Sequence, residues 1–383
     1  MKNRMKVILE KIKKMTTLLF YLFPINKNKI AVYNFSGGGY GDNPKYIVEE
    51  LMKISNKYKI IWFVKKSSDD FPKFIKQVKY NSLLSYYHLI TSKLWLDTVR
   101  NNPRPVFKRK KQFYIQTWHG GIPMKGIEKD VEDKLSLSYV RQAKRDGKLA
   151  DYMLSNCEKR TELIKRAFWF DGEILEFGVP RDDVLFNPNE KAIEDLKNRY
   201  NISNKKIVLY APSFRNSNDF YDKLEFNVNL LKKVVENRFG ENYVVCMKCH
   251  PNDLHKIDFG GKYANVIDFS KEGDSQLVLS ASDIVISDYS SMLLDFTLTK
   301  RPTLIYAPDY NEYISNERNL YIDLKNIAIP FAETFDQLIK NIENFDKHIY
   351  KEKLKKFFEY YGIFEKGDSA KKIVEFLISN KIL

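Results

Sequence analysis

The alternation of short apolar strands with helical stretches is the feature that most constrains the fold of this chain. Strand patterns rich in β-branched and aromatic residues are separated by amphipathic patterns with a helical period, for example at 44–54 and 158–168. Strands that alternate with helices in this way indicate parallel sheets with helices on both faces. The predicted strands cover residues 29–34, 59–64, 94–97, 112–117, 152–155, 173–177, 206–210, 243–247, 265–268, 283–287 and 303–306.

The chain is long enough for two such domains, because 383 residues is about twice an ordinary domain. A polar connection over 181–191 separates the two runs of strands. We therefore expect an α/β fold with two doubly wound Rossmann-type domains facing a central cleft. The predicted parts are an N-terminal segment 1–28, a first domain 29–185, and a second domain 186–383.

Polar side chains follow several of the predicted strands. His119 lies where a strand gives way to a glycine loop, and His250 follows another strand. Ligands of open α/β sheets bind outside the carboxyl ends of the strands, so such residues are candidates for one shared site. Ser290 and Ser291 precede an apolar run and are predicted to begin a helix, whose first turn favours phosphate.

Six motifs follow one another in a fixed order and together span nearly the whole chain after the first 30 or so residues. The motifs are Asp42-Asn43-Pro44-Lys45-Tyr46, Gln116 to Lys125, Gly178-Val179-Pro180-Arg181-Asp182, Ala211-Pro212-Ser213-Phe214-Arg215, His250-Pro251, and Ser287 to Phe296 followed by Lys300-Arg301-Pro302. In this order they resemble the CDP-glycerol glycerophosphotransferases, the teichoic acid primases and polymerases of Gram-positive envelopes. The resemblance implies a GT-B-like fold, with the first domain on the acceptor side and the second on the CDP-glycerol side, whose last helices, 350–383, cross back to the first domain.

The resemblance also implies roles for individual residues. His119 would be the general base for the acceptor hydroxyl, and its neutral-range pKa suits that role. His250 would lie at the nucleotide phosphates, and Arg181, Arg215 and Lys248 are candidate phosphate ligands. Relatives often have Gly-Thr-Pro where this chain has Gly-Gly-Ile-Pro, so the match around residues 121 and 122 is not one to one. The residues that would line the CDP-glycerol site are Trp118, Gly120, Gly121, Pro212, Ser213, Ser290, Ser291 and Asp295.

No cofactor or metal ion is expected. The chain has no Asp-x-Asp sequence, so basic side chains and helix N-termini would neutralise the diphosphate in place of a metal clamp. Cys246, Cys249 and His250 have the spacing of a c-type haem site, but cysteines three apart on a strand point to opposite faces. Buried strand cysteines are the better interpretation.

The net charge of +15 favours anionic partners, and part of the excess lies at the N-terminus. Residues 1–29 hold eight basic residues and one acid, and Met15, Leu19 and Leu22 continue an apolar stripe that begins at Met1. We interpret 1–28 as an amphipathic segment on an anionic membrane surface. A signal peptide and a core-packing helix are the alternatives. A second basic cluster, 100–111, is interpreted either as a solvated loop or as part of the anion-binding surface.

These observations predict a peripheral enzyme at the cytoplasmic face of the membrane. It would transfer glycerol phosphate from CDP-glycerol to a polyprenyl-diphosphate-linked or glycan acceptor and release CMP. Transfer of ribitol phosphate or a sugar on the same scaffold is an alternative, and so is a nonenzymatic basic membrane-binding protein. Nucleic acid is not expected as a partner, because no basic stripe interleaved with aromatic residues is present. The sequence leaves the oligomeric state open.

Overall fold

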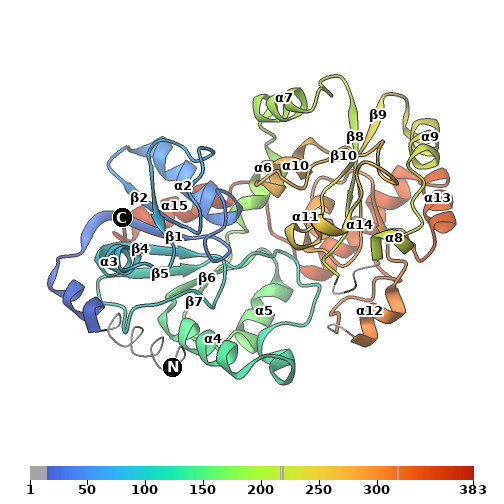
Figure 1. Cartoon of the computed structure of the whole chain (residues 1–383). Helices are drawn as coiled ribbons and strands as arrows, with labels where there is room; N and C mark the ends of the chain where they lie inside the picture. The colour runs from blue at the N-terminus through green and yellow to red at the C-terminus, as the bar shows by residue number, and fades with distance from the viewer. Residues whose placement is uncertain (1–14, 216, 218–219, 317–318) are drawn as a thin grey trace, which may run out of the picture.

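The chain folds into two α/β domains, each built on a parallel sheet (Figure 1). The computed structural model describes residues 15–215, 217, 220–316 and 319–383. The first sheet has the order β3-β2-β1-β4-β5-β6-β7, and the second has the order β10-β9-β8-β11-β12-β13. In both sheets the strand order reverses beside the first strand, as in Rossmann folds. The expected pair of doubly wound domains is confirmed.

The first domain contains seven strands whose central members are buried on both faces. The edge strand β3 was not predicted, because it alternates exposed lysines with buried Ile75 and Val78 over only five residues. The strands are β1 Asn26–Tyr33, β2 Lys59–Val64, β3 Ile75–Lys79, β4 Ser92–Asp97, β5 Phe113–Gln116, β6 Tyr152–Leu154 and β7 Glu173–Leu175. The helices are η1 Phe20–Leu22, α2 Asp42–Ile54, α3 Leu83–Thr91, η2 Glu128–Lys134, α4 Leu137–Leu149 and α5 Glu158–Ala167.

The second domain repeats this plan with shorter strands. Its edge strand β13 has two residues, too few for a sequence pattern. The strands are β8 Lys206–Ala211, β9 Tyr243–Met247, β10 Ile267–Asp268, β11 Ile284–Ser287, β12 Thr303–Tyr306 and β13 Phe331–Ala332. The helices are α7 Glu190–Arg199, α8 Phe220–Lys223, α9 Val228–Phe239, η4 Pro251–Lys256, α10 Ser275–Ala281, α11 Ser291–Thr297, α12 Tyr310–Asn316, α13 Phe335–Glu343, α14 Lys347–Tyr361 and α15 Ser369–Ser379.

The two domains are joined by a short helical connection and by the C-terminus. The connection is η3 Pro180–Asp182 followed by α6 Asp183–Phe186, and α6 lies beside α10 where the domains meet (Figure 1). Helix α15 packs beside α2, and its Ile373, Val374 and Leu377 join the apolar core of the first domain. Helix α14 instead joins an apolar cluster with Tyr289 and Leu293 of the second domain. Of the last helices, α15 is therefore the one that crosses back.

The second basic cluster proves not to be one solvated loop. Arg100 and Arg104 are buried, and Arg104 bonds Asp97 at 2.5 Å and Asp146 at 2.9 Å. Lys110 and Lys111 of the same cluster are exposed. The solvated-loop interpretation was wrong for the two arginines, because their carboxylate partners lie on other elements and give no local sequence signal.

The described part of the N-terminal segment lies on the first domain and exposes its apolar stripe. Met15, Leu19 and Leu22 are 70%, 60% and 83% exposed. Tyr21 fixes the segment, since its ring stacks on Phe107 at 4.1 Å. The first strand begins at Asn26, so the boundary predicted at residue 28 falls inside β1. Residues 1–14, which carry most of the predicted basic stripe, lie outside the described residues. Among those that are described, no helix is long and apolar enough to cross a membrane.

Candidate active site

His119 lies three residues after the end of β5 at the C-terminal edge of the first sheet. The preceding residue, Trp118, has a left-handed backbone with φ of 57°, and its ring stacks on the imidazole at 4.3 Å. Imidazole Nδ1 lies 2.8 Å from the carbonyl oxygen of Thr98. A carbonyl can only accept, so Nδ1 carries the proton and the lone pair of the neutral ring is on Nε2.

The electrostatic setting keeps this imidazole neutral. Burial lowers the pKa of His119 below its usual value, and the carbonyl of Thr98 and Asp42 oppose that shift, while Arg181 and Arg160 reinforce it. A base must be unprotonated to act, and a lowered pKa leaves it unprotonated at neutral pH. His119 is therefore in the tautomer and charge state that a general base requires.

Arg181, in η3, connects the His119 loop to the second domain. Its guanidinium donates to the carbonyl oxygen of His119 at 2.7 Å, to Asp42 at 3.1 Å and to Asp295 at 2.5 Å. Asp42 begins α2 of the first domain, while Asp295 lies in α11 of the second. One buried side chain thus holds the His119 loop and both domains together.

Gly121 lies against the same interdomain cluster. A side chain there would meet Asn156 Nδ2 at 2.9 Å, Asp295 Oδ1 at 3.1 Å and Asp182 Oδ2 at 3.4 Å. Burial raises the pKa of both Asp182 and Asp295. Gln276 of α10 donates to Asp182 at 2.5 Å, and this hydrogen bond joins the second domain to η3 of the interdomain connection. Position 121 therefore needs glycine because a buried carboxylate cluster occupies the space of a side chain.

The loop after β8 lies beside the loop after β11 in the second domain. Pro212 is buried, and the next residue, Ser213, donates its backbone N–H to Asp288 at 2.9 Å. The hydroxyl of Ser213 is buried and has no hydrogen-bond partner in the described structure. This loop therefore brings a hydroxyl close to the start of α11.

The loops at the C-terminal edge of the second sheet form what we call the second edge, and Arg215 is its central charged residue. Its guanidinium donates to Asp288 at 2.6 Å and to Asp309 at 2.5 Å, and also to the carbonyl oxygen of Ser213 at 2.8 Å. Tyr289 packs its ring 5.0 Å from the guanidinium carbon. The loops after β8, β11 and β12 are consequently tied to one another by a single arginine.

His250 has the opposite tautomer to His119. It precedes η4, and its Nδ1 accepts a hydrogen bond from the backbone N–H of Asn252 at 3.2 Å. The neutral ring therefore carries its proton on Nε2, which is free to donate. The side chain is exposed and its pKa is lowered by burial of part of the ring. An exposed N–H donor suits contact with a phosphate oxygen.

Lys248 and the two serines complete the second edge. Lys248 directs its ammonium to the carbonyl oxygen of Glu272 at 2.6 Å, and burial lowers its pKa. Ser290 caps α11 by accepting from the N–H of Met292 at 3.3 Å, and Ser291 is the first residue of that helix. The predicted helix start is confirmed. Because Asp295 lies one turn further along α11, this helix links both edges of the site.

Comparison with known proteins decides the family. Residues 15–379 match the CDP-Glycerol:Poly(glycerophosphate) glycerophosphotransferase family. A teichoic acid poly(glycerol phosphate) polymerase of Bacillus spizizenii is 32% identical over 374 residues, covering 93% of each chain. A teichoic acid glycerol-phosphate transferase of Staphylococcus aureus is 29% identical and covers 98% of each. A solved structure of the wall teichoic acid polymerase TagF superposes with a TM-score of 0.83 at 29% identity, covering 99% of this chain and 96% of that one.

The chain belongs to the CDP-glycerol glycerophosphotransferase family. It is an enzyme with the GT-B-like fold, as the resemblance implied. The nonenzymatic alternative is thereby set aside.

The structure of this glycerophosphotransferase brings the predicted site residues into two groups. One group lies at the junction of the domains and consists of Trp118, His119, Gly120, Gly121, Arg181 and Asp295. The other group lies along the second edge and consists of Pro212, Ser213, Arg215, Lys248, His250, Ser290 and Ser291. Both predicted arginine phosphate ligands direct their guanidinium groups to carboxylates and carbonyls, so neither is presented as an open anion site. Direct contact of Arg181 and Arg215 with phosphate stays a prediction.

Of the carboxylates that hold these arginines, only Asp295 was predicted as a site residue. Asp42 stood in a quoted motif without a role, and Asp288 stood in the motif before Ser290. Both follow the end of a strand or begin a helix, which is a signal that could have found them. Asp182 stood beside Arg181 in another of the motifs, and Asp309 follows the predicted strand 303–306 by three residues, so the same signal applied to them.

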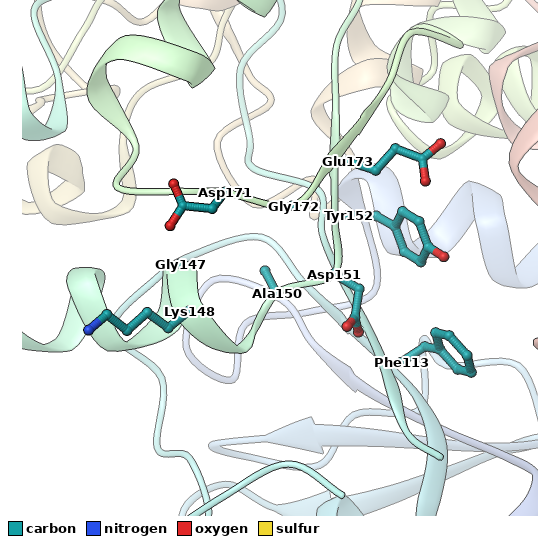
Figure 2. A pocket seen from close by; sticks show the side chains of 9 residues that line it. All are labelled: Phe113, Gly147, Lys148, Ala150, Asp151, Tyr152, Asp171, Gly172 and Glu173. Atoms are coloured by element: carbon teal, nitrogen blue, oxygen red, sulfur yellow. The ribbon is translucent and has the colours of Figure 1, made fainter. Parts of the chain in front are cut away.

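A shallow pocket of about 430 Å³ lies on the opposite, amino-terminal edge of the first sheet of the glycerophosphotransferase. Its acidic side chains, Asp151, Asp171 and Glu173, do not converge on one point (Figure 2). An acidic lining disfavours a nucleotide diphosphate. No cluster of three or more metal-binding side chains occurs among the described residues.

Proposed function

We propose that this glycerophosphotransferase moves glycerol phosphate from CDP-glycerol to a hydroxyl of a lipid-linked acceptor in teichoic acid or related envelope polymer synthesis. His119 is the general base. The observation that carries this proposal is the hydrogen bond from His119 Nδ1 to the carbonyl of Thr98, which leaves the Nε2 lone pair free for the acceptor proton. The donor occupies the second edge, from Ser213 to Ser290.

The transfer step balances without a cofactor. The acceptor oxygen forms a bond to the phosphorus that carries glycerol, and the bond from that phosphorus to the oxygen bridging to CMP breaks. The acceptor proton moves to His119 Nε2, and CMP leaves with the bonding electron pair. Phosphoryl transfer depends mostly on positioning and charge, which here come from His250 Nε2–H, Lys248 and the start of α11.

Substitution of His119 tests the proposal. His119→Ala is expected to lower kcat by roughly 10²-fold or more while CDP-glycerol still binds, because general bases contribute about 10² to 10⁴. His348, exposed on α14, gives a matched control whose alanine variant keeps full rate. CMP release is measured with CDP-glycerol, CDP-ribitol and UDP-sugars, with and without lipid-linked acceptor. A His119→Ala enzyme with near-full rate, or a clear preference for another donor, contradicts the proposal.

The same assay tests independence from metal ions. The proposal uses basic groups and helix N–H donors for the diphosphate charge, so chelation with EDTA is expected to leave kcat unchanged. Activity lost in EDTA and restored by magnesium contradicts this part.

We further propose that the enzyme is a peripheral protein at the cytoplasmic face of the membrane. Support comes from the exposed side chains of Leu18, Leu19 and Leu22 beside exposed Val106 and Phe107, with the basic residues Lys110 and Lys111 in the same loop as the last two. An exposed apolar patch with basic neighbours is typical of a surface that enters the headgroup region. Such a surface would bring the site to a polyprenyl-linked acceptor.

Vesicle sedimentation tests the membrane surface. Changing Leu18, Leu19 and Leu22 to glutamine is expected to weaken binding to anionic vesicles about tenfold or more, since each apolar side chain loses its burial. Leu230 and Ile349, exposed on α9 and α14, are the matched control pair. Activity on a soluble acceptor analogue should be kept in both variants. Unchanged vesicle binding, or equal loss in the control, contradicts the proposed surface.

A further inference from the structure

The loop that carries His119 lacks a strand partner for its carbonyl groups. Its first and last carbonyls are bonded by a single side chain from α5, since Arg160 Nη2 donates to Thr117 O at 3.3 Å and Arg160 Nη1 donates to Gly121 O at 3.2 Å. Arg160 is buried, with 3% of its surface exposed. One planar guanidinium therefore connects the two ends of the loop.

Two of the three carbonyls between these ends accept hydrogen bonds from other side chains. Asn43 Nδ2 donates to Trp118 O at 3.1 Å, and Arg181 Nη1 donates to His119 O at 2.7 Å. The backbone N–H of Arg181 in turn donates to Asn43 Oδ1 at 3.0 Å. Side chains from three separate elements thus replace the pairing that a strand would give this loop.

Arg160 has an unusual charge environment for a buried arginine. Within the described structure it has no carboxylate close enough for an ion pair, and its hydrogen-bond partners are backbone carbonyls. Burial lowers its pKa to about 10, and the nearby Arg181 adds to that effect. Burying a cation without a counter-ion costs free energy. The two hydrogen bonds to carbonyl oxygens are what stabilise the guanidinium at this position.

We propose that Arg160 is a positioning residue for catalysis, which clamps the two ends of the 117–121 loop and so sets the direction of His119 Nε2. This inference rests on the proposed role of His119 as general base. The hydrogen bonds of Arg160 go to the backbone of the loop and not to the imidazole of His119. Its planar fork is needed because one guanidinium can donate to both carbonyls at once, whereas a lysine ammonium cannot hold the same two directions.

Two substitutions distinguish the hydrogen-bonding geometry of Arg160 from its positive charge. Arg160→Lys keeps the positive charge but loses the fork, and is expected to lower kcat roughly 10- to 100-fold with little change in the KM for CDP-glycerol, since small misplacements of a catalytic group are that costly. Arg160→Met also removes the charge. The groups that face His119 are Asp42, Arg181 and Arg160, so removing one cation raises the pKa of His119. The acid limb of kcat/KM then moves to higher pH in Arg160→Met and stays in place in Arg160→Lys.

Arg301 supplies the matched control. It is a largely buried arginine that also donates to two backbone carbonyls, those of Ser280 and Ser282, in the second domain. Arg301→Lys is expected to lower the melting temperature about as much as Arg160→Lys while kcat stays within about twofold of the parent enzyme.

The outcomes decide between a positioning role and a structural one. A low kcat in Arg160→Lys with a folded protein and normal donor KM supports the clamp, and so does recovery of Arg160→Ala activity by added methylguanidinium. Equal losses of rate in Arg160→Lys and Arg301→Lys, or full rate in Arg160→Lys, overturn it. If His119→Ala itself keeps its rate, the role of His119 as general base fails. An inactive His119→Ala variant together with a fully active Arg160→Lys variant overturns the positioning role of Arg160 and leaves the role of His119 as general base standing.

Discussion

The two edges that form the site present histidines of opposite polarity. At the first edge His119 is half-buried and offers an unprotonated Nε2, because its Nδ1 donates to Thr98. At the second edge His250 is exposed and offers a protonated Nε2, because its Nδ1 accepts from Asn252. A residue type alone does not assign a role. The backbone group that each ring meets leaves one histidine with a free lone pair on Nε2 and the other with a free N–H on Nε2.

The arginines at the two edges differ in a similar way. Arg181 bonds Asp42 of the first domain and Asp295 of the second, whereas the ion pairs of Arg215 to Asp288 and Asp309 stay within the second domain. Only Arg181 also holds the carbonyl of His119. We therefore expect Arg215 to matter chiefly for the stability of the donor domain, and Arg181 to matter chiefly for turnover.

Removing the Arg215 charge should give the largest effect. Arg215→Met leaves the buried Asp288 and the partly buried Asp309 without their cation, and is expected to lower the free energy of unfolding by about 3–5 kcal/mol, as broken buried pairs do. Chemical denaturation with a fluorescence readout measures this. The double variant Arg215→Met with Asp309→Leu should recover part of the loss, because one orphaned carboxylate is then gone. A stable single variant would erase the contrast between the two arginines.

Arg181→Lys should lower kcat by roughly 10²-fold with a smaller loss of stability. Lysine keeps the charge between Asp42 and Asp295 but cannot also donate to the carbonyl of His119 in the same geometry. Steady-state CMP release gives kcat, and thermal unfolding gives the stability. Arg199, half-exposed and paired with Glu272, is the control that should change neither quantity. If Arg181→Lys instead unfolds the protein at unchanged specific activity, the two arginines have the same role.

His250→Ala should raise the donor KM roughly tenfold or more and change kcat less, because a hydrogen bond to a charged phosphate contributes about 1.5–3 kcal/mol. His250→Gln keeps an N–H donor and should recover part of the donor affinity. Initial rates at varied CDP-glycerol concentration measure both. A loss confined to kcat would place His250 with His119 in the chemical step. The proposed difference, in which one Nε2 accepts a proton and the other donates a hydrogen bond to phosphate, would then be wrong.

The sequence predicted the strands and the residues at their ends well. Eleven strands were expected, and each corresponds to one of the observed strands, because buried parallel strands are continuous apolar runs. The positions of His119, His250 and Ser290 at element ends followed from the same patterns. Of the two interpretations left open for the basic cluster 100–111, the solvated loop was wrong for Arg100 and Arg104, since their environment depends on Asp97, Asp146 and Glu128 from other elements.

What the sequence determined by itself is local: the alternation that makes two Rossmann-type domains, the glycine loop after β5 and the serine cap of α11. These follow from neighbours within a few residues, whose periodicity and turn chemistry act before the chain is compact. The tertiary structure alone decided the partners of the arginines. Arg181 meets Asp295 from 114 residues away, and Arg160 meets Gly121 from 39 residues away. Such contacts depend on which loops the packed sheets bring to one edge, and no local pattern encodes that.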